Sequence, residues 1–218
     1  MITEKRISRF LAVALVTFML ATQAIFLGTA AFAENREKES QKEINIWETA
    51  EYQIYNKENI DKLAKEYQVE PDYLYYIAEV ERTYNLEPYE LFALIYMESK
   101  FVPQTKMDGG SLSYNTTQMK LSTAVTAYMA ITQYYEKNIP YPTHDLLNEN
   151  KYYATLLAGG YLKYLHETYK DKYESYTAYR MGITGRLGFF KKNGDYRSPY
   201  ALQLDQIRSS LLQGATKI

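Results

Sequence analysis

The stretch "PYELFALIYMESKF", residues 88–101, places a glutamate on the apolar side of a predicted helix. Leu91, Leu94 and Ile95 recur at the spacing of a helix face turned to a core, and Glu98 takes the next position of that stripe. A carboxylate at such a position lies at the solvent-exposed edge of the core, forms an ion pair, or has its pKa raised by desolvation. A raised pKa suits a general acid near neutral pH, so Glu98 is the first catalytic candidate.

The pattern of apolar residues predicts helices along nearly all of the chain beyond its N-terminal quarter, and no long alternating run predicts a strand. Pro71 and Pro88 predict two helix starts, because proline favours the first turn. Residues 102–118 are the irregular interval of note, and Gly109–Gly110 predicts a turn within it. We therefore expect an all-α domain with a short loop or hairpin after the helix that carries Glu98.

A weak internal repeat at an offset of 17 residues aligns Pro71 with Pro88 and Glu81 with Glu98. It predicts two consecutive helices of similar design, since one repeat is too little for a solenoid. The repeat gives Glu98 a rival, because Glu81 occupies the same position on its own apolar stripe. The neighbouring Arg82 favours an ordinary ion pair, so we interpret Glu81 as a structural residue.

The first 33 residues have the composition of a secretory signal. A basic start is followed by a long apolar run that ends in Ala31-Phe32-Ala33, the small-x-small pattern of a cleavage site. An uncleaved membrane anchor is the alternative, because the apolar run approaches the length of a span. Both interpretations predict that the rest of the chain lies outside the cytoplasm, either secreted and extracellular or associated with the cell wall.

Three further segments follow this signal. Residues 34–45 are charged and predict a solvated linker. Residues 46–83 predict an N-terminal helical extension, and residues 84–218 the main domain.

Composition excludes several classes of chemistry. The chain has no cysteine, which excludes disulfides and thiol catalysis. Beyond residue 33 it has 22 basic and 25 acidic residues, a balance that argues against nucleic acid as a partner. His144 and His166 lack the spacing of metal ligands, so we expect no metal and no cofactor. The 24 tyrosines suit contacts with sugars and peptides, although many belong in a core.

Four motifs then occur in order between residues 84 and 190. They are the pair Glu98-Ser99, the segment with Gln118 and Thr123-Ala124, the helix "GGYLKYL" at 159–165, and "AYRMG" at 178–182. In this order and spacing they resemble the lytic transglycosylase domain of the soluble type (SLT), a family with a lysozyme-like fold related to goose-type lysozyme. Two departures accompany the likeness. Asn115–Thr117 stand where glycine, leucine and methionine are usual, and Arg180 replaces an asparagine.

The resemblance implies an exported enzyme that cleaves the β-1,4 bond between N-acetylmuramic acid and N-acetylglucosamine in peptidoglycan glycan strands. Glu98 would act as general acid and then general base, leaving 1,6-anhydro-muramic ends without a second carboxylate. The implied substrate-binding residues are Ser99, Gln118, Tyr179, Arg180 and Gly182. Among them, the tyrosine would orient the Glu98 carboxylate by a hydrogen bond, the glutamine would bind the sugar, and the glycine would keep the backbone close to the cleft.

Two alternatives remain open. Asp108, ten residues beyond Glu98, is a candidate second carboxylate that would permit hydrolysis, as in goose-type lysozymes, although an aspartate before two glycines is often a turn former. The departures from the motifs favour a catalytically degenerate module that binds or assembles the wall. Arg180 either pairs with Glu98 and lowers its pKa, or binds a carboxylate of a peptide stem.

Overall fold

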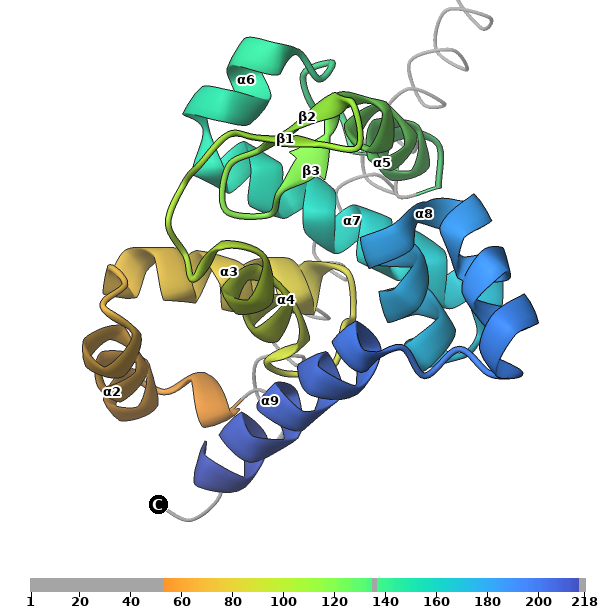
Figure 1. The fold of residues 1–218 in the computed structure, drawn as a ribbon. Helices are drawn as coiled ribbons and strands as arrows, with labels where there is room; N and C mark the ends of the chain where they lie inside the picture. Colours follow the sequence, from red (N-terminus) through yellow and green to blue (C-terminus); the bar gives the residue numbers. More distant parts are fainter. Residues whose placement is uncertain (1–52, 135–136, 216–218) are drawn as a thin grey trace, which may run out of the picture. The chain divides into compact units, whose positions relative to one another are not determined.

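The computed structural model describes residues 53–134 and 137–215 (Figure 1). The predicted signal and charged linker, residues 1–33 and 34–45, lie outside this part of the chain. The described residues form eight α-helices and a small three-strand antiparallel sheet, so the mainly helical class is confirmed. The described residues belong to one compact unit, which includes the helices of the predicted N-terminal extension. No helix in the described part is long and apolar enough to cross a membrane.

The elements follow one another along the chain with short connections. They are a 3-10 turn at Gln53–Tyr55, then α2 (Lys57–Tyr67), α3 (Pro71–Thr83), α4 (Glu90–Ser99), β1 (Lys106–Asp108), β2 (Ser111–Tyr114), β3 (Met119–Lys120), α5 (Leu121–Tyr134), α6 (His144–Glu149), α7 (Lys151–Tyr169), α8 (Lys172–Asn193) and α9 (Pro199–Ala215).

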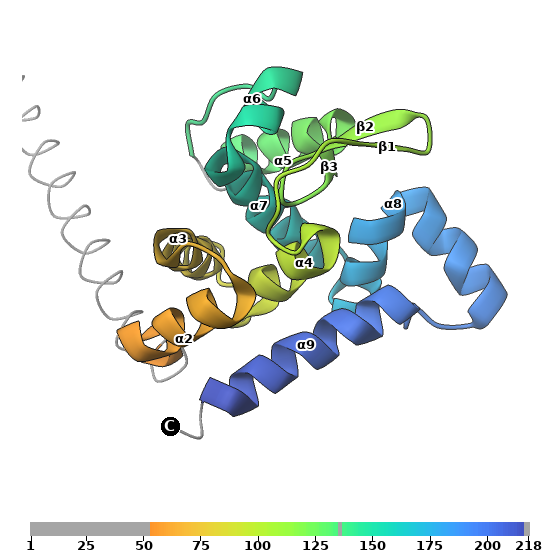
Figure 2. The same cartoon turned by 60° about the vertical axis from the view of Figure 1, so that its left-hand side comes forward.

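Helix α4 lies in the middle of this arrangement. Figures 1 and 2 both show it between the sheet, the first half of α8 and the start of α9. All five consecutive residues from Leu91 to Ile95 are buried, so the helix is covered on every side and is not an amphipathic surface helix with one apolar stripe. Only its last turn, where Glu98 lies, emerges from the core.

Helix α7 is the scaffold behind α4, and it packs against α3, α5, α6 and α8. Gly159 and Gly160 permit this packing. A Cβ atom at Gly159 would collide with the side chain of Val80 in α3, and one at Gly160 with Ile131 in α5. The glycine pair therefore allows two neighbouring helices to approach the α7 backbone closely.

The N-terminus of α4 differs from the prediction. Pro71 occupies the first turn of α3 as expected, but Pro88 does not begin α4, which starts at Glu90. Tyr89 precedes the helix in a left-handed conformation with φ of 62°. This strained residue is held because its N–H donates to a buried carboxylate of α3, that of Glu81, at 3.0 Å.

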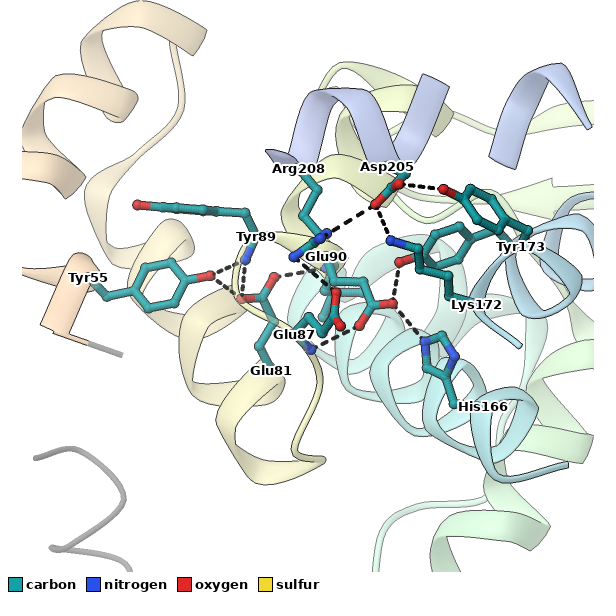
Figure 3. A network of polar contacts seen from close by, with 12 residues as sticks. Tyr55, Glu81, Glu87, Tyr89, Glu90, His166, Lys172, Tyr173, Asp205 and Arg208 are labelled. Atoms are coloured by element: carbon teal, nitrogen blue, oxygen red, sulfur yellow. Dashed lines mark hydrogen bonds and ion pairs between the residues drawn. The ribbon is translucent and has the colours of Figure 1, made fainter. Parts of the chain in front are cut away.

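Glu81 binds the first turn of α4 from inside the core (Figure 3). Its Oε1 accepts hydrogen bonds from the N–H groups of Leu91 and Phe92, at 2.8 and 3.0 Å. Its Oε2 accepts from Tyr89 N–H and from the Tyr55 hydroxyl. A carboxylate at a helix N-terminus satisfies donors that lack partners within the helix. The interpretation of Glu81 as a structural residue agrees with these contacts. The contacts come from α4 and Tyr55, whereas the sequence favoured an ion pair with the neighbouring Arg82.

A second buried carboxylate, Glu90, joins α4 to the helices that follow it (Figure 3). Its Oε1 accepts from His166 Nε2 in α7 at 2.7 Å and from the Tyr176 hydroxyl in α8 at 2.6 Å. In α9, Arg208 pairs with Glu87 at 2.9 Å and with Asp205 at 3.4 Å. These contacts fix α7, α8 and α9 around the N-terminal end of α4.

The irregular interval of the sequence, predicted to be a short loop or a hairpin, folds as a hairpin. Strand β1 pairs with β2 in antiparallel register, Lys106 opposite Ser113 and Asp108 opposite Ser111, and β2 pairs with β3. Gly109 and Gly110 form the turn with φ values of 57° and 80°, the left-handed conformations that a two-residue hairpin turn requires. The hairpin extends beside the last turn of α4 (Figure 2).

Candidate functional site

Glu98 lies in the last turn of α4, where the helix leaves the core. Its side chain is only 5% exposed. Oε1 accepts a hydrogen bond from the Tyr200 hydroxyl at 2.7 Å, and Oε2 lies 3.4 Å from Nη1 of Arg180. Tyr200 comes from the first turn of α9 and Arg180 from α8, so three helices meet at this carboxyl group.

The pKa of Glu98 is raised above its usual range, as predicted from the sequence, and burial is the largest cause. The hydrogen bond from Tyr200 and the positive charge of Arg180 oppose the rise. The charges of Asp108 and Lys106 have smaller effects, the former raising the pKa and the latter lowering it. The Glu98 carboxyl therefore holds a proton more readily than an exposed glutamate, even with a guanidinium nearby.

Two cavities meet at Glu98. One of about 310 Å³ lies toward β1 and Tyr200, and one of about 150 Å³ lies toward Tyr179 and Gly182. The two linings have four residues in common, which are Glu98, Asp108, Gln118 and Arg180. A ligand in either cavity would therefore lie next to Glu98.

Tyr179 does not make the expected contact with Glu98. Its hydroxyl donates instead to the backbone oxygen of Thr117 at 3.4 Å, and its ring lines the smaller cavity. The tyrosine that donates to Glu98 is Tyr200, which the sequence analysis missed. No local signal could identify it, since it is one of 24 tyrosines and lies 102 positions from its partner.

Gln118 and Ser99 have partners within the protein. The Gln118 amide donates to the backbone oxygens of Gln104 and Asn115, each at 2.7 Å, while its side chain borders both cavities. The Ser99 hydroxyl donates to the Thr116 carbonyl at 2.7 Å and lines neither cavity. In this structure the serine connects the end of α4 to the loop after β2.

Gly182 borders the smaller cavity and kinks α8. Its φ of 73° and ψ of 170° belong to a region that is essentially restricted to glycine, and a Cβ atom there would meet no other atom within 4 Å. The glycine is therefore required by the backbone conformation and not by crowding. The kink lies two residues after Arg180, whose guanidinium contacts Glu98.

The segment Asn115–Thr117, where the sequence departs from the motifs that it resembles, is buried. The Asn115 amide donates to the carbonyls of Leu147 and Asn148 at the end of α6, at 3.0 and 2.9 Å. The Thr116 hydroxyl bonds to the Tyr73 hydroxyl of α3 at 2.7 Å. Asn115 and Thr116 thus anchor the loop that precedes Gln118. The buried hydroxyl of Thr117 has no hydrogen-bond partner among the described residues.

Other concave surfaces lack this combination of groups. A cavity of about 450 Å³ between α2, α4 and α9 is lined by a mixture of apolar and polar side chains, such as Tyr67, Leu211 and Glu66, and by none of the predicted site residues. Within residues 53–134 and 137–215, no three histidine or carboxylate side chains are grouped to hold a metal ion.

Comparison with protein-family models, with curated proteins and with solved structures finds no match for this chain.

Proposed function

We propose that this protein is a peptidoglycan lytic transglycosylase with a lysozyme-like architecture, acting outside the cytoplasm on glycan strands. The observation that carries the proposal is the position of Glu98, a buried carboxyl with a raised pKa at the junction of two cavities. A general acid requires both a proton near neutral pH and access to the bond it cleaves.

In the proposed reaction, Glu98 gives its proton to the oxygen that bridges N-acetylmuramic acid and N-acetylglucosamine. The bond from that oxygen to the anomeric carbon breaks, and the acetamido group of the substrate stabilises the positive charge that develops. The ionised Glu98 then takes the proton of the C6 hydroxyl, whose oxygen closes the 1,6-anhydro ring. The hydrogen bond from Tyr200 to Oε1 stabilises the ionised carboxylate between the two proton transfers.

Incubation of the purified full chain with cell-wall sacculi tests this function. Mass spectrometry of the released fragments should show 1,6-anhydro ends, and Glu98→Gln should lower their release by about 100-fold or more, because the general acid is lost. Glu79→Gln, which changes an exposed glutamate of α3, is the matched control and should cleave as well as the unchanged protein. Undiminished cleavage by Glu98→Gln contradicts the proposal.

A second candidate function is hydrolysis, which Asp108 favours because it lines both cavities together with Glu98. A second carboxylate can activate water on the far side of the sugar. The hydrolase is supported if the released fragments carry reducing ends in place of anhydro ends, and if Asp108→Asn no longer releases these fragments. If no fragment is released although the protein sediments with the sacculi, a wall-binding module is favoured over both enzymes.

A further inference from the structure

Positive charge exceeds negative charge around the two cavities when Glu98 carries the proton that an acid needs. The charged residues that line them are Lys106, Lys120, Arg180, Glu98 and Asp108. Lys120 is neutralised by Asp108, whose Oδ2 lies 3.2 Å from its Nζ. With Glu98 protonated, the charges of Lys106 and Arg180 remain without compensation, and they favour an anionic group in the larger cavity that both of them line.

Arg180 has donors to spare for such a group. Its side chain is 49% exposed, and a single nitrogen, Nη1, contacts Glu98 at 3.4 Å. A guanidinium carries five N–H donors in a planar fork that matches the two oxygens of a carboxylate. The guanidinium carbon lies 5.9 Å from the centre of the Tyr200 ring, which supports the group from one side.

Lys106 is the second cation of the larger cavity. It lies on the exposed strand β1, opposite Ser113, and no described carboxylate forms an ion pair with it. Its charge nevertheless acts on Glu98, whose pKa it lowers slightly. The two cations come from separate elements, β1 and α8, so they flank the space next to the acid.

We propose that Arg180, assisted by Lys106, binds a carboxylate of the substrate beside Glu98, and that the site selects glycan strands whose peptide stems carry free carboxylates. This inference rests on the proposed function, and it names the part of the substrate that the site distinguishes. A neutral sugar offers a guanidinium only hydroxyl and carbonyl oxygens, whereas a stem carboxylate offers a charge-assisted, two-pronged contact.

Soluble peptidoglycan strands, either untreated or with their stem carboxylates converted to amides by carbodiimide and ammonia, test the proposal. For the unchanged protein, amidation should lower kcat/KM by about tenfold, the effect of losing one charge-assisted hydrogen bond. In Arg180→Gln the two substrates should differ by less than about twofold, while Arg180→Lys, which keeps the charge but loses the fork, should fall between. Lys192→Gln, on the exposed far end of α8, controls for loss of a cation and should retain the tenfold preference.

The outcomes separate this inference from the proposed function. Equal cleavage of both substrates by the unchanged protein overturns the carboxylate site and leaves the enzyme intact. Cleavage of neither substrate overturns the enzyme, and sedimentation with insoluble sacculi, either untreated or amidated in the same way, then decides the binding question. Tighter association with untreated walls, lost in Arg180→Gln and kept in Lys192→Gln, supports the carboxylate contact, whereas equal association overturns it.

Discussion

Glu81 and Glu98 occupy matching positions in two similar helices, and burial raises the pKa of both. The pKa of Glu81 reaches about 8, against hydrogen bonds from Tyr55 and from the backbone of α4. Glu81 is enclosed by these donors and borders none of the cavities described above, whereas Glu98 borders two. Access, more than the pKa alone, distinguishes a candidate acid from a structural carboxylate.

At this scale, the Tyr200 hydroxyl should control the proton affinity of Glu98. It donates to the ionised carboxylate, so its removal in Tyr200→Phe disfavours ionisation and raises the Glu98 pKa. Since the acid must be protonated to work, the alkaline limb of the pH dependence of kcat/KM should move upward by roughly one unit.

The matched control for this change is Tyr179→Phe. The Tyr179 hydroxyl donates to the Thr117 carbonyl and makes no hydrogen bond to Glu98, so the alkaline limb should stay in place. A limb that moves equally in both variants, or in neither, contradicts the assignment of Tyr200 as the residue that positions the acid.

At the scale of elements, the site depends on how α8 and the hairpin approach the end of α4. Arg180 precedes the kink at Gly182, and Lys106 and Asp108 lie on β1. The kink separates the buried first half of α8 from a second half that is mostly exposed. The turn at Gly109–Gly110 and the kink at Gly182 both have backbone conformations that favour glycine. These two places set the positions of β1 and α8 relative to the end of α4.

Gly182→Ala should therefore lower the free energy of unfolding by about 1–3 kcal/mol, because an alanine cannot adopt φ of 73° and ψ of 170° without strain. Gly188→Ala, in the regular part of the same helix, should raise it by about 0.5–1 kcal/mol, since alanine favours helix over glycine. Urea denaturation of the two variants measures the opposite signs. A higher free energy of unfolding for Gly182→Ala would contradict the glycine-specific backbone conformation at the kink.

At the scale of the whole described unit, the buried Glu90 links α4, α7 and α8. The pKa of Glu90 is lowered although burial acts to raise it, because the contacts with His166 and Tyr176 favour the ionised form. A carboxylate whose pKa is lower in the folded than in the unfolded protein stabilises above the unfolded pKa, and this contribution is lost as the pH falls through the folded value.

Glu90→Gln should accordingly be less stable than the unchanged protein by about 2–4 kcal/mol at pH 7, and the difference should shrink as the pH falls below about 4. Urea denaturation at pH 7 and at pH 3 measures both differences. Glu149→Gln changes an exposed glutamate and should stay within about 0.5 kcal/mol of the unchanged protein at either pH. A constant difference for Glu90→Gln at both pH values contradicts ionisation of the buried residue.

Several features could be predicted from neighbouring residues because their causes are local. The periodic apolar residues predict helices, Pro71 predicts the start of α3, and Gly109–Gly110 predicts the hairpin turn. The raised pKa of Glu98 also follows from its position among apolar neighbours. The start of α4 could not be predicted from Pro88, because Tyr89 is held by contacts with another helix.

By itself, then, the sequence determined the helical class, the turn at Gly109–Gly110 and the burial of Glu98, since each depends on residues within a few positions of one another. Only the tertiary structure decided that α4 is covered on every side, and that Tyr200 rather than Tyr179 donates to Glu98. It also decided that Arg180 and Lys106 face the same cavity. The physical reason is that hydrogen bonds and charges act across a few ångströms of space, and the packing of helices brings together residues as far apart in the chain as Glu98 and Tyr200.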